Sequence, residues 1–190
     1  MNEILKLNYS HIWAVSHFMA KFEVRFYLCG MLVDGENLVA TDGHAMGICG
    51  MEHNEEFKQQ YKNGLIIPSY AINSLVRKLG KPVGIKKNRD IDLLKINDQF
   101  FVLTDNLDAH EYFSAVDGRY PNYKRVDMPK PTIVPRSAVI LDSKYLIKFN
   151  KVADGIGKVR PVVYFGEDDK KACYVEISEN MHCIVMPLRT

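Results

Sequence analysis

The stretch LIIPSYAINSLVRKLG, residues 65–80, joins a short apolar strand to an amphipathic helix. The run Leu65–Ile67 has the length and apolar character of a buried strand. Pro68 suits the first turn of a helix, because its missing N–H would have no intrahelical partner there. Apolar side chains then recur at helical spacing, which predicts a helix over residues 69–79 with one buried face. Those side chains are Ile72, Leu75, Val76 and Leu79.

The same order of elements is predicted upstream of this stretch. A helix over residues 9–22, capped by Asn8 or Ser10, has apolar side chains at helical spacing. Asp34-Gly35 and Asp42-Gly43 are typical hairpin turns between short strands. The apolar stripe of the helix consists of Ile12, Val15, Met19 and Phe22, widened by Trp13 and Phe18. The strands are predicted at 25–33, 38–41 and 45–51.

The pattern continues downstream and then starts a third time. A strand over 138–141 leads into a helix over 143–153, with Leu146, Phe149 and Ala153 facing inward. The remaining strands are predicted at 83–86, 92–96, 99–104 and 111–115, then at 159–165, 172–178 and 182–186. The chain therefore reads as an α+β protein of three β-α-β-β-β units, repeated every 60 to 70 residues or so, with helices covering antiparallel sheets.

Composition limits the class of protein. The chain has 190 residues, 47% of them apolar, and a net charge of only +2. It contains no apolar run of about 18 residues and no secretory signal, so we expect a cytoplasmic protein that does not contact a membrane. Its four cysteines stand singly in apolar surroundings, which favours reduced core thiols over a metal site. No metal and no cofactor is expected.

Positive charge is concentrated on the predicted helices. The first helix offers His11, His17 and Lys21 at exposed positions, and the acidic residues lie mostly in loops. The other two helices offer Arg77 and Lys78, with Lys81 just beyond, and Lys144, Lys148 and Lys151. Such segregation indicates a surface that faces a polyanion, although lysine-rich solvated helix faces also arise without a function.

Four segments carry a resemblance to a known family. They are residues 24–32 (VRFYLCGML), 39–44 (VATDGH), 113–126 (FSAVDGRYPNYKRV) and 185–190 (VMPLRT). In this order and spacing they resemble the bacterial DNA polymerase III β subunit, the β sliding clamp. The resemblance implies the DNA-clamp fold, with antiparallel sheets outside and helices inside. Residues 1–128 resemble the complete middle domain of that clamp, and residues 129–190 resemble the second half of its C-terminal domain.

An odd number of units leaves one unit without a partner, which predicts a homo-oligomer. A usual clamp ring contains twelve units, and four copies of this chain would supply that number, so a tetrameric ring is expected. The resemblance implies that such a ring encircles double-stranded DNA without reading its sequence and acts as a polymerase processivity factor. Its implied partners are a replicative polymerase and other clamp-binding proteins, with a clamp loader as a further candidate.

The resemblance also assigns two sets of residues. For DNA contact these are Lys21, Arg25, Tyr27, Arg77, Lys78, Lys144, Lys148 and Lys151, while Phe26 fits the core equally well. For a hydrophobic groove that binds partner peptides they are Leu28, Thr41, His44, Met46, Pro68, Ile72, Ile184, Val185, Met186, Pro187, Leu188 and Arg189. The family usually has an arginine after the histidine of this motif, where this chain has Ala45, so peptide preference is expected to differ.

The sequence has two other interpretations. The TDGH stretch at residues 41–44 pairs an acid with a histidine, as in acid–base chemistry, but a hairpin turn explains it better, and no catalytic motif is present, so no enzyme is expected. The alternative within the family is a clamp-derived interaction protein. It would bind clamp-seeking peptides, or a host clamp, without encircling DNA. The basic helices favour a clamp, and the missing units favour the alternative.

Overall fold

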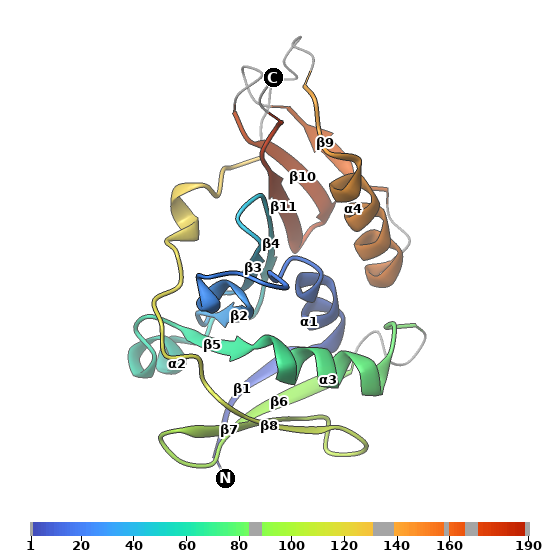
Figure 1. Ribbon diagram of the computed structural model, residues 1–190. Helices are drawn as coiled ribbons and strands as arrows, with labels where there is room; N and C mark the ends of the chain where they lie inside the picture. Colours follow the sequence, from blue (N-terminus) through green and yellow to red (C-terminus); the bar gives the residue numbers. More distant parts are fainter. Residues whose placement is uncertain (1, 84–88, 131–138, 158–159, 166–170, 189–190) are drawn as a thin grey trace.

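The computed structural model describes residues 2–83, 89–130, 139–157, 160–165 and 171–188. The four-stranded sheet lies at the bottom of Figure 1 and the strands nearest the C-terminus lie at the top. Helices α1 and α4 lie on the same side of the larger sheet, the right-hand side in that view. This arrangement has the α+β class and antiparallel sheets that the sequence predicts.

The elements fall into three successive groups. The first contains β1 (Asn2–Asn8), α1 (Tyr9–Ser16), the 3-10 helix η1 (Phe26–Leu28), β2 (Gly30–Val33), β3 (Asn37–Thr41) and β4 (Ala45–Gly50). After the short helix α2 (Glu55–Gln60), the second contains β5 (Leu65–Pro68), α3 (Ser69–Leu79), β6 (Asp90–Lys95), β7 (Phe100–Thr104) and β8 (His110–Ser114). After the 3-10 helix η3 (Tyr123–Arg125), the third contains α4 (Ser143–Ile156), β9 (Val162–Tyr164), β10 (Cys173–Ser178) and β11 (Met181–Val185).

The first two groups exchange their opening strands. The four-stranded sheet has the order β1-β6-β7-β8, so β1 completes the sheet of the second group. The seven-stranded sheet has the order β5-β2-β3-β4-β11-β10-β9, so β5 completes the sheet of the first. All pairings are antiparallel. Because each group lends a strand to the other, neither can fold as a separate unit.

The third group joins the first through strand pairing. Strand β11 lies antiparallel to β4, with Met181 opposite Cys49 and Val185 opposite Ala45. This ladder extends one sheet across residue 128, the predicted boundary between a complete domain and a half domain. The division at that residue stays a prediction.

Helices α1 and α4 pack directly on each other. Helix α1 is buried on nearly all sides, which explains its uniformly apolar sequence around Ile12–Val15. The rings of Phe18 and Phe149 stack with centroids 6.1 Å apart. Gly155 of α4 lies against Trp13, and a Cβ at Gly155 would overlap the indole ring. Glycine is therefore required there by close packing, not by backbone conformation.

Several boundary predictions were wrong. Helix α1 ends at Ser16, six residues early, and Phe22 is fully exposed. Ser16 Oγ donates to Trp13 O at 2.7 Å, a ring nitrogen of His17 lies 2.8 Å from the same oxygen, and the next bond is of the tighter i, i+3 type. These local hydrogen bonds compete with the i, i+4 hydrogen bonds of the α-helix, and the helix ends there. In α4, Leu146 is 40% exposed and Tyr145 faces the core in its place.

Other differences concern strands. Strand β1 was not predicted, because Asn, Glu and Lys interrupt its apolar pattern, and the run before Gly30 forms η1. Residues 139–141 form no strand, and residue 138 lies outside the described residues. The strand predicted at 83–86 lies outside the described part except for Val83, which is not in a strand. Helices α3 and α4 begin where the sequence predicts.

The close contact at Gly155 gives a stability test. We expect Gly155→Ala to lower the free energy of unfolding by about 1–3 kcal/mol, because the new methyl group must displace Trp13. Alanine normally favours a helix over glycine by about 1 kcal/mol, so intrinsic propensity predicts the opposite sign. Urea unfolding measures the difference. Asn150→Ala, at an exposed position of the same helix, is the control and should be neutral or slightly stabilising. A stabilised Gly155→Ala would contradict the packing described here.

Candidate functional site

A cavity of about 200 Å³ lies where β4 meets β11. Four segments that are distant in sequence line it: η1 with the residue before it, the β3–β4 turn, the segment after β8, and the end of β11. Its lining residues are Arg25, Leu28, Thr41, Gly43, His44, Ala45, Met46, Tyr120, Pro121, Asn122, Tyr123, Val126, Ile184 and Met186. We call it the junction cavity. The lining is mostly apolar and includes a few polar side chains, as is typical of ligand-binding sites.

Asp42 holds the turn on one side of the junction cavity. Its Oδ1 accepts hydrogen bonds from the N–H groups of His44 (3.0 Å) and Ala45 (2.9 Å). Its Oδ2 accepts one from Lys148 Nζ of α4, at 3.0 Å. Burial opposes ionisation of this carboxyl, but these hydrogen bonds outweigh it and lower its pKa. The N–H of Met186 donates to His44 O at 3.1 Å, so the turn is also tied to the chain after β11.

Two tyrosines fix the opposite side. The hydroxyl of Tyr120 accepts a hydrogen bond from Thr41 N–H at 3.1 Å. The hydroxyl of Tyr123 donates to Asp34 Oδ2 at 2.6 Å and accepts from Asn37 Nδ2 at 3.0 Å. Burial raises the pKa of both phenols, so both stay protonated. The segment after β8 is thus pinned onto the β2–β3–β4 sheet, and the cavity wall that it forms is preorganised.

The structure brings half of the predicted groove residues together. Leu28, Thr41, His44, Met46, Ile184 and Met186 line the junction cavity. Val185 does not, because successive side chains of a strand point to opposite faces and Val185 faces the core. Pro68 pairs with Gly30 at the sheet edge, and Ile72 is buried in the main core. Pro187 and Leu188 lie beyond the lining, and Arg189 lies outside the described residues.

Sequence reasoning missed the wall formed by Tyr120–Tyr123 and Val126. Its residues belong to a segment, residues 113–126, that had been singled out only as a motif and as a turn. The signal was available, since two tyrosines flanking Pro-Asn provide apolar rings with hydroxyl groups that can be anchored. Arg25 was predicted to contact DNA, and it also lines this cavity.

A second cavity, of about 660 Å³, lies between α1, α3 and α4. Lys21, Lys148 and Lys151 line it, together with neutral polar groups such as Ser16, Ser69 and Asn73. Burial lowers the pKa of the adjacent His17, and the charges of Lys151 and Lys148 lower it further. Three of the eight residues predicted to contact DNA therefore converge on one helical face.

The residues predicted to contact DNA differ in whether a carboxylate of the same chain pairs with their charge. Lys78 pairs with Glu111 at 2.8 Å, Lys144 with Asp142 at 2.9 Å, and Arg25 with Glu23 at 3.2 Å. Lys148 pairs with Asp42. Within the described part of the chain, Lys21, Arg77 and Lys151 have no ion-pair partner, and all three are exposed. Tyr27 is half-buried beside Phe26, which is itself 56% exposed and so is not a core residue.

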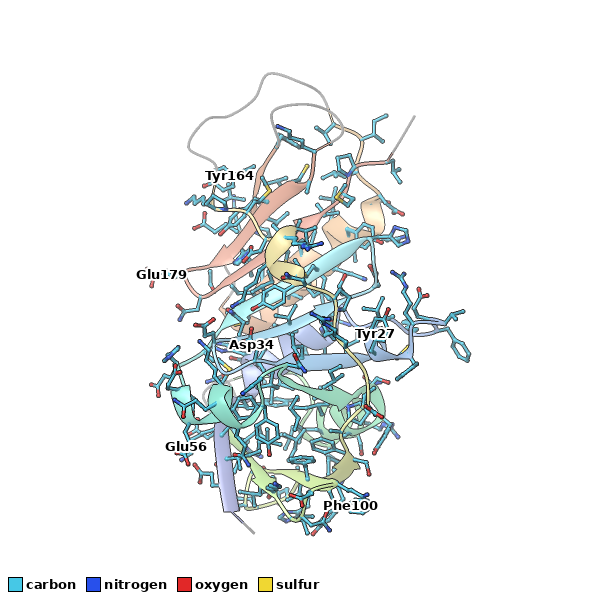
Figure 2. All side chains as sticks on the ribbon, turned by 90° about the vertical axis from the view of Figure 1, so that its left-hand side faces the viewer. Tyr27, Asp34, Glu56, Phe100, Tyr164 and Glu179 are labelled. Atoms are coloured by element: carbon cyan, nitrogen blue, oxygen red, sulfur yellow. The ribbon has the colours of Figure 1, made fainter. Side chains whose placement is uncertain are left out.

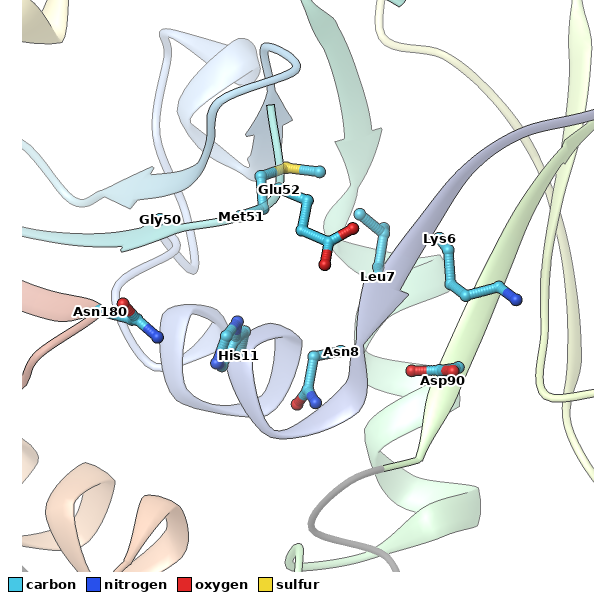
Figure 3. Close-up of a pocket in the computed structure, with 9 residues that line it drawn as sticks. All are labelled: Lys6, Leu7, Asn8, His11, Gly50, Met51, Glu52, Asp90 and Asn180. Carbon is cyan, nitrogen blue, oxygen red and sulfur yellow. The ribbon is translucent and has the colours of Figure 1, made fainter. Parts of the chain in front are cut away.

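A third cavity, of about 550 Å³, lies between β1, the start of α1 and the chain after β4 (Figure 3). Lys6, His11, Glu52 and Asp90 extend into it from separate elements and do not converge on one point. Burial lowers the pKa of His11, which was expected to be exposed. No group of three potential metal ligands exists among the residues that the structure describes. In the same part of the chain, no helix is long and apolar enough to cross a membrane.

Comparison with known proteins identifies the relatives of this chain. No family model matches it. The beta sliding clamp of Vibrio cholerae is 36% identical over 121 residues, which cover 60% of this chain and 29% of that protein. The beta sliding clamp of Escherichia coli K12 is 33% identical over 126 residues, 63% of this chain and 31% of that protein. This chain is a homologue of the beta sliding clamp. It spans less than a third of the length of these relatives.

Solved clamp structures share the fold. A DNA polymerase sliding clamp from Bacillus subtilis superposes with a TM-score of 0.71, covering 100% of this chain and 65% of that one, at 12% identity. The DNA polymerase III subunit beta from Pseudomonas aeruginosa gives 0.66, covering 98% and 66%, at 17% identity. The predicted family and the predicted DNA-clamp fold are both confirmed.

The ion pair between Asp42 and Lys148 gives a pH-dependent prediction. Asp42→Asn keeps an acceptor for the two backbone N–H groups but removes the charge, and we expect it to cost about 1 kcal/mol of unfolding free energy at pH 7. Because folding lowers the pKa of Asp42, this stabilisation is present above the carboxyl's unfolded pKa and is lost as pH falls through the folded value.

Denaturant unfolding of both proteins from pH 7 to pH 3 measures this difference. The gap between native protein and variant should shrink below about pH 4, where the unfolded carboxyl begins to bind protons. Asp154→Asn, at an exposed position of α4, is the control. A gap that is constant with pH would show that the charge of Asp42 is not what stabilises the turn.

Proposed function

We propose that this clamp homologue acts as a DNA sliding clamp: copies of the chain close into a ring around duplex DNA and tether a replication protein to it. The single observation that carries the proposal is the coexistence of an open cationic helix face and a preorganised apolar cavity on one clamp fold. The two sites correspond to the two tasks of a processivity factor, holding DNA and holding a partner.

The helix face suits contact with DNA that is independent of sequence. Lysine and arginine side chains on helices can reach phosphate oxygens, and phosphate contacts carry no sequence information. Lys21, Arg77 and Lys151 are exposed and carry the charge that is not compensated by a neighbouring carboxylate. Water-mediated contacts of this kind would leave a ring free to move along the duplex.

The junction cavity suits an extended peptide with apolar side chains. Leu28, Met46 and Ile184 supply its apolar surface, and Met186 is exposed enough to adapt to a bound side chain. Ala45 stands where the family usually has an arginine. The guanidinium of Arg25 lies beside Gly43 at the same cavity and could supply the missing positive charge.

The number of β-α-β-β-β units in the chain supports a ring. In this proposal residues 1–128 form a complete clamp domain and residues 129–190 form half of one, so one unit in each chain lacks a partner. Four copies would supply the twelve units of a usual clamp ring, closed by two-fold axes. A replicative polymerase and a clamp loader are the proposed partners.

One observation favours the alternative, a clamp-derived protein that binds partner peptides or a host clamp without encircling DNA. Lys78, Lys144 and Lys148 are engaged with carboxylates of the same chain, so the helix face is less cationic than the sequence suggests. In this case the junction cavity would work alone.

Retention on DNA separates the two functions. We expect the protein to stay bound to nicked circular DNA in gel filtration at moderate salt and to be released when the circle is cut, because a ring is held topologically. The triple variant with Lys21, Arg77 and Lys151 changed to Glu should lose retention, and its binding should depend less steeply on salt. Lys62→Glu, in the loop after α2, is the control. Equal release from circular and linear DNA would favour the alternative.

Peptide binding tests the junction cavity. A clamp of Pseudomonas aeruginosa has been solved bound to griselimycin, which can serve as the probe. We expect griselimycin to bind this chain, and Met186→Glu or Val126→Glu to weaken binding at least about tenfold, because the bound ligand would bury an unpaired carboxylate. Calorimetry measures the affinity. Leu107→Glu, at an exposed turn position, is the control. Unchanged affinity in both cavity variants would place the probe elsewhere.

A further inference from the structure

The last strands of the first two groups, β4 and β8, differ in whether their outer edge is paired with another strand. Strand β4, the last of the first group, has a neighbour on both sides, because β11 pairs with its outer edge. Strand β8, the last of the second group, pairs only with β7 among the described residues. It belongs to the sheet at the bottom of Figure 1, at the opposite end of the molecule from β9–β11. Phe100 of β7 lies opposite Ser114 of β8, and its label in Figure 2 shows where this end of the molecule lies.

The hydrogen-bonding groups of this edge point outward in a regular order. At the mouth of the β7–β8 hairpin, Ala109 O accepts a hydrogen bond from Asp105 N–H at 3.2 Å. In an antiparallel pair the bonded positions alternate, so the N–H and C=O groups of His110, Tyr112 and Ser114 are directed away from β7. Lys78 Nζ lies 3.3 Å from His110 O, which agrees with that direction.

One side chain covers part of this edge, because Lys78 Nζ of α3 donates to His110 O, but the side chains of β8 itself leave it open. His110, Tyr112 and Ser114 are exposed, and Tyr112 is 60% exposed. Glu111 points inward, and an inward charge is one of the devices that keep sheet edges apart. Here Lys78 Nζ lies 2.8 Å from a carboxylate oxygen of Glu111, which weakens the repulsion that this charge would exert on a second strand. Strand β8 also contains neither proline nor lysine, the two residues that most often guard an edge.

We propose that β8 pairs antiparallel with β8 of a second copy of this chain, about a two-fold axis at Tyr112. The proposal rests on the proposed function in that it specifies one joint of the ring. In this register His110 lies opposite Ser114 of the second copy, and the two Tyr112 rings face each other. About six backbone hydrogen bonds would form.

Other registers are less favourable. Moving the axis to Glu111 would place two carboxylates opposite each other, and like charges in that position are destabilising. Moving it to either end of the strand would shorten the overlap. A shift of the register by an odd number of residues is excluded, because an exposed side chain of one copy would then lie opposite a buried side chain of the other.

A second copy is favoured over an unrelated partner by the chain's own architecture. The pairing of β4 with β11 already joins the last strand of one group to the last strand of another, antiparallel and in register over five residue pairs. Strand β8 is the counterpart of β4 in the second group. A joint between two β8 strands would repeat the same contact between chains.

The test uses charge complementation at the two-fold axis. Y112K and Y112E should each raise the dissociation constant of this joint at least about 100-fold, because each places like charges opposite themselves. An equimolar mixture of the two variants should reassociate, because Lys and Glu then face each other. Sedimentation velocity without DNA measures the mass in each case. Ile147→Lys, at an exposed position of α4, adds the same charge away from β8 and should leave assembly unchanged.

The outcomes separate this joint from the proposed function. Both variants should keep the native circular dichroism spectrum, because Tyr112 is exposed. Recovery of mass only in the mixture supports the joint. Unchanged assembly in Y112K, no recovery in the mixture, or a native protein that is monomeric at all concentrations overturns it, while griselimycin binding would still test the junction cavity. Recovery in the mixture together with failure on circular DNA would leave the joint standing and refute the sliding role.

Discussion

The ladder between β4 and β11 is the contact on which both candidate sites depend. This strand pairing brings Ile184 and Met186 next to Met46 in the junction cavity. It also places helix α4 against helix α1. The stacking of Phe18 on Phe149 and the seating of Trp13 against Gly155 then fix the angle between those helices. A strand pairing between residues more than a hundred positions apart thus creates a cavity on one side of the sheet and a helical face on the other.

The charges of the helical face divide into structural and available ones. Lys148 is only 27% exposed, bonds Asp42 and lies over the Phe18 ring at 5.6 Å, so it helps to hold α4 in place. Lys144 is 60% exposed in its pair with Asp142, and exposed pairs contribute only about 0–1 kcal/mol. A phosphate could therefore compete for Lys144. The field of this face thus depends on a few exposed cations, because total charge is nearly balanced.

The sequence predicted the parts of this structure that depend on local periodicity. Helix α3 and the β3–β4 hairpin follow from apolar spacing and from Asp-Gly turns, because those signals act within a few residues. The end of α1 did not follow, since Phe22 continues the helical spacing while Ser16 and His17 bond the backbone and stop the helix. Strand β1 was missed because its pairing with β6 is non-local. For the cavity, resemblance supplied Leu28, Met46 and Ile184, but Tyr120 and Tyr123 required knowledge of tertiary contacts.

Strand exchange sets where the proposed ring could be divided between copies of the chain. Each of the first two groups is completed by the other's opening strand, β1 or β5, so the pair behaves as one cooperative block. In the proposed ring, joints between blocks would be edge-to-edge ladders like β4–β11, some within a chain and some between chains. Within a chain, the linker supplies an effective concentration in the millimolar range for short flexible connections. A ring made from copies of this chain would lack that advantage at every joint between chains, so its closure would depend on protein concentration and on the free energy of each ladder. In such a proposed ring, opening at one joint between chains would cost the free energy of a single ladder, with no linker to hold the two ends close together.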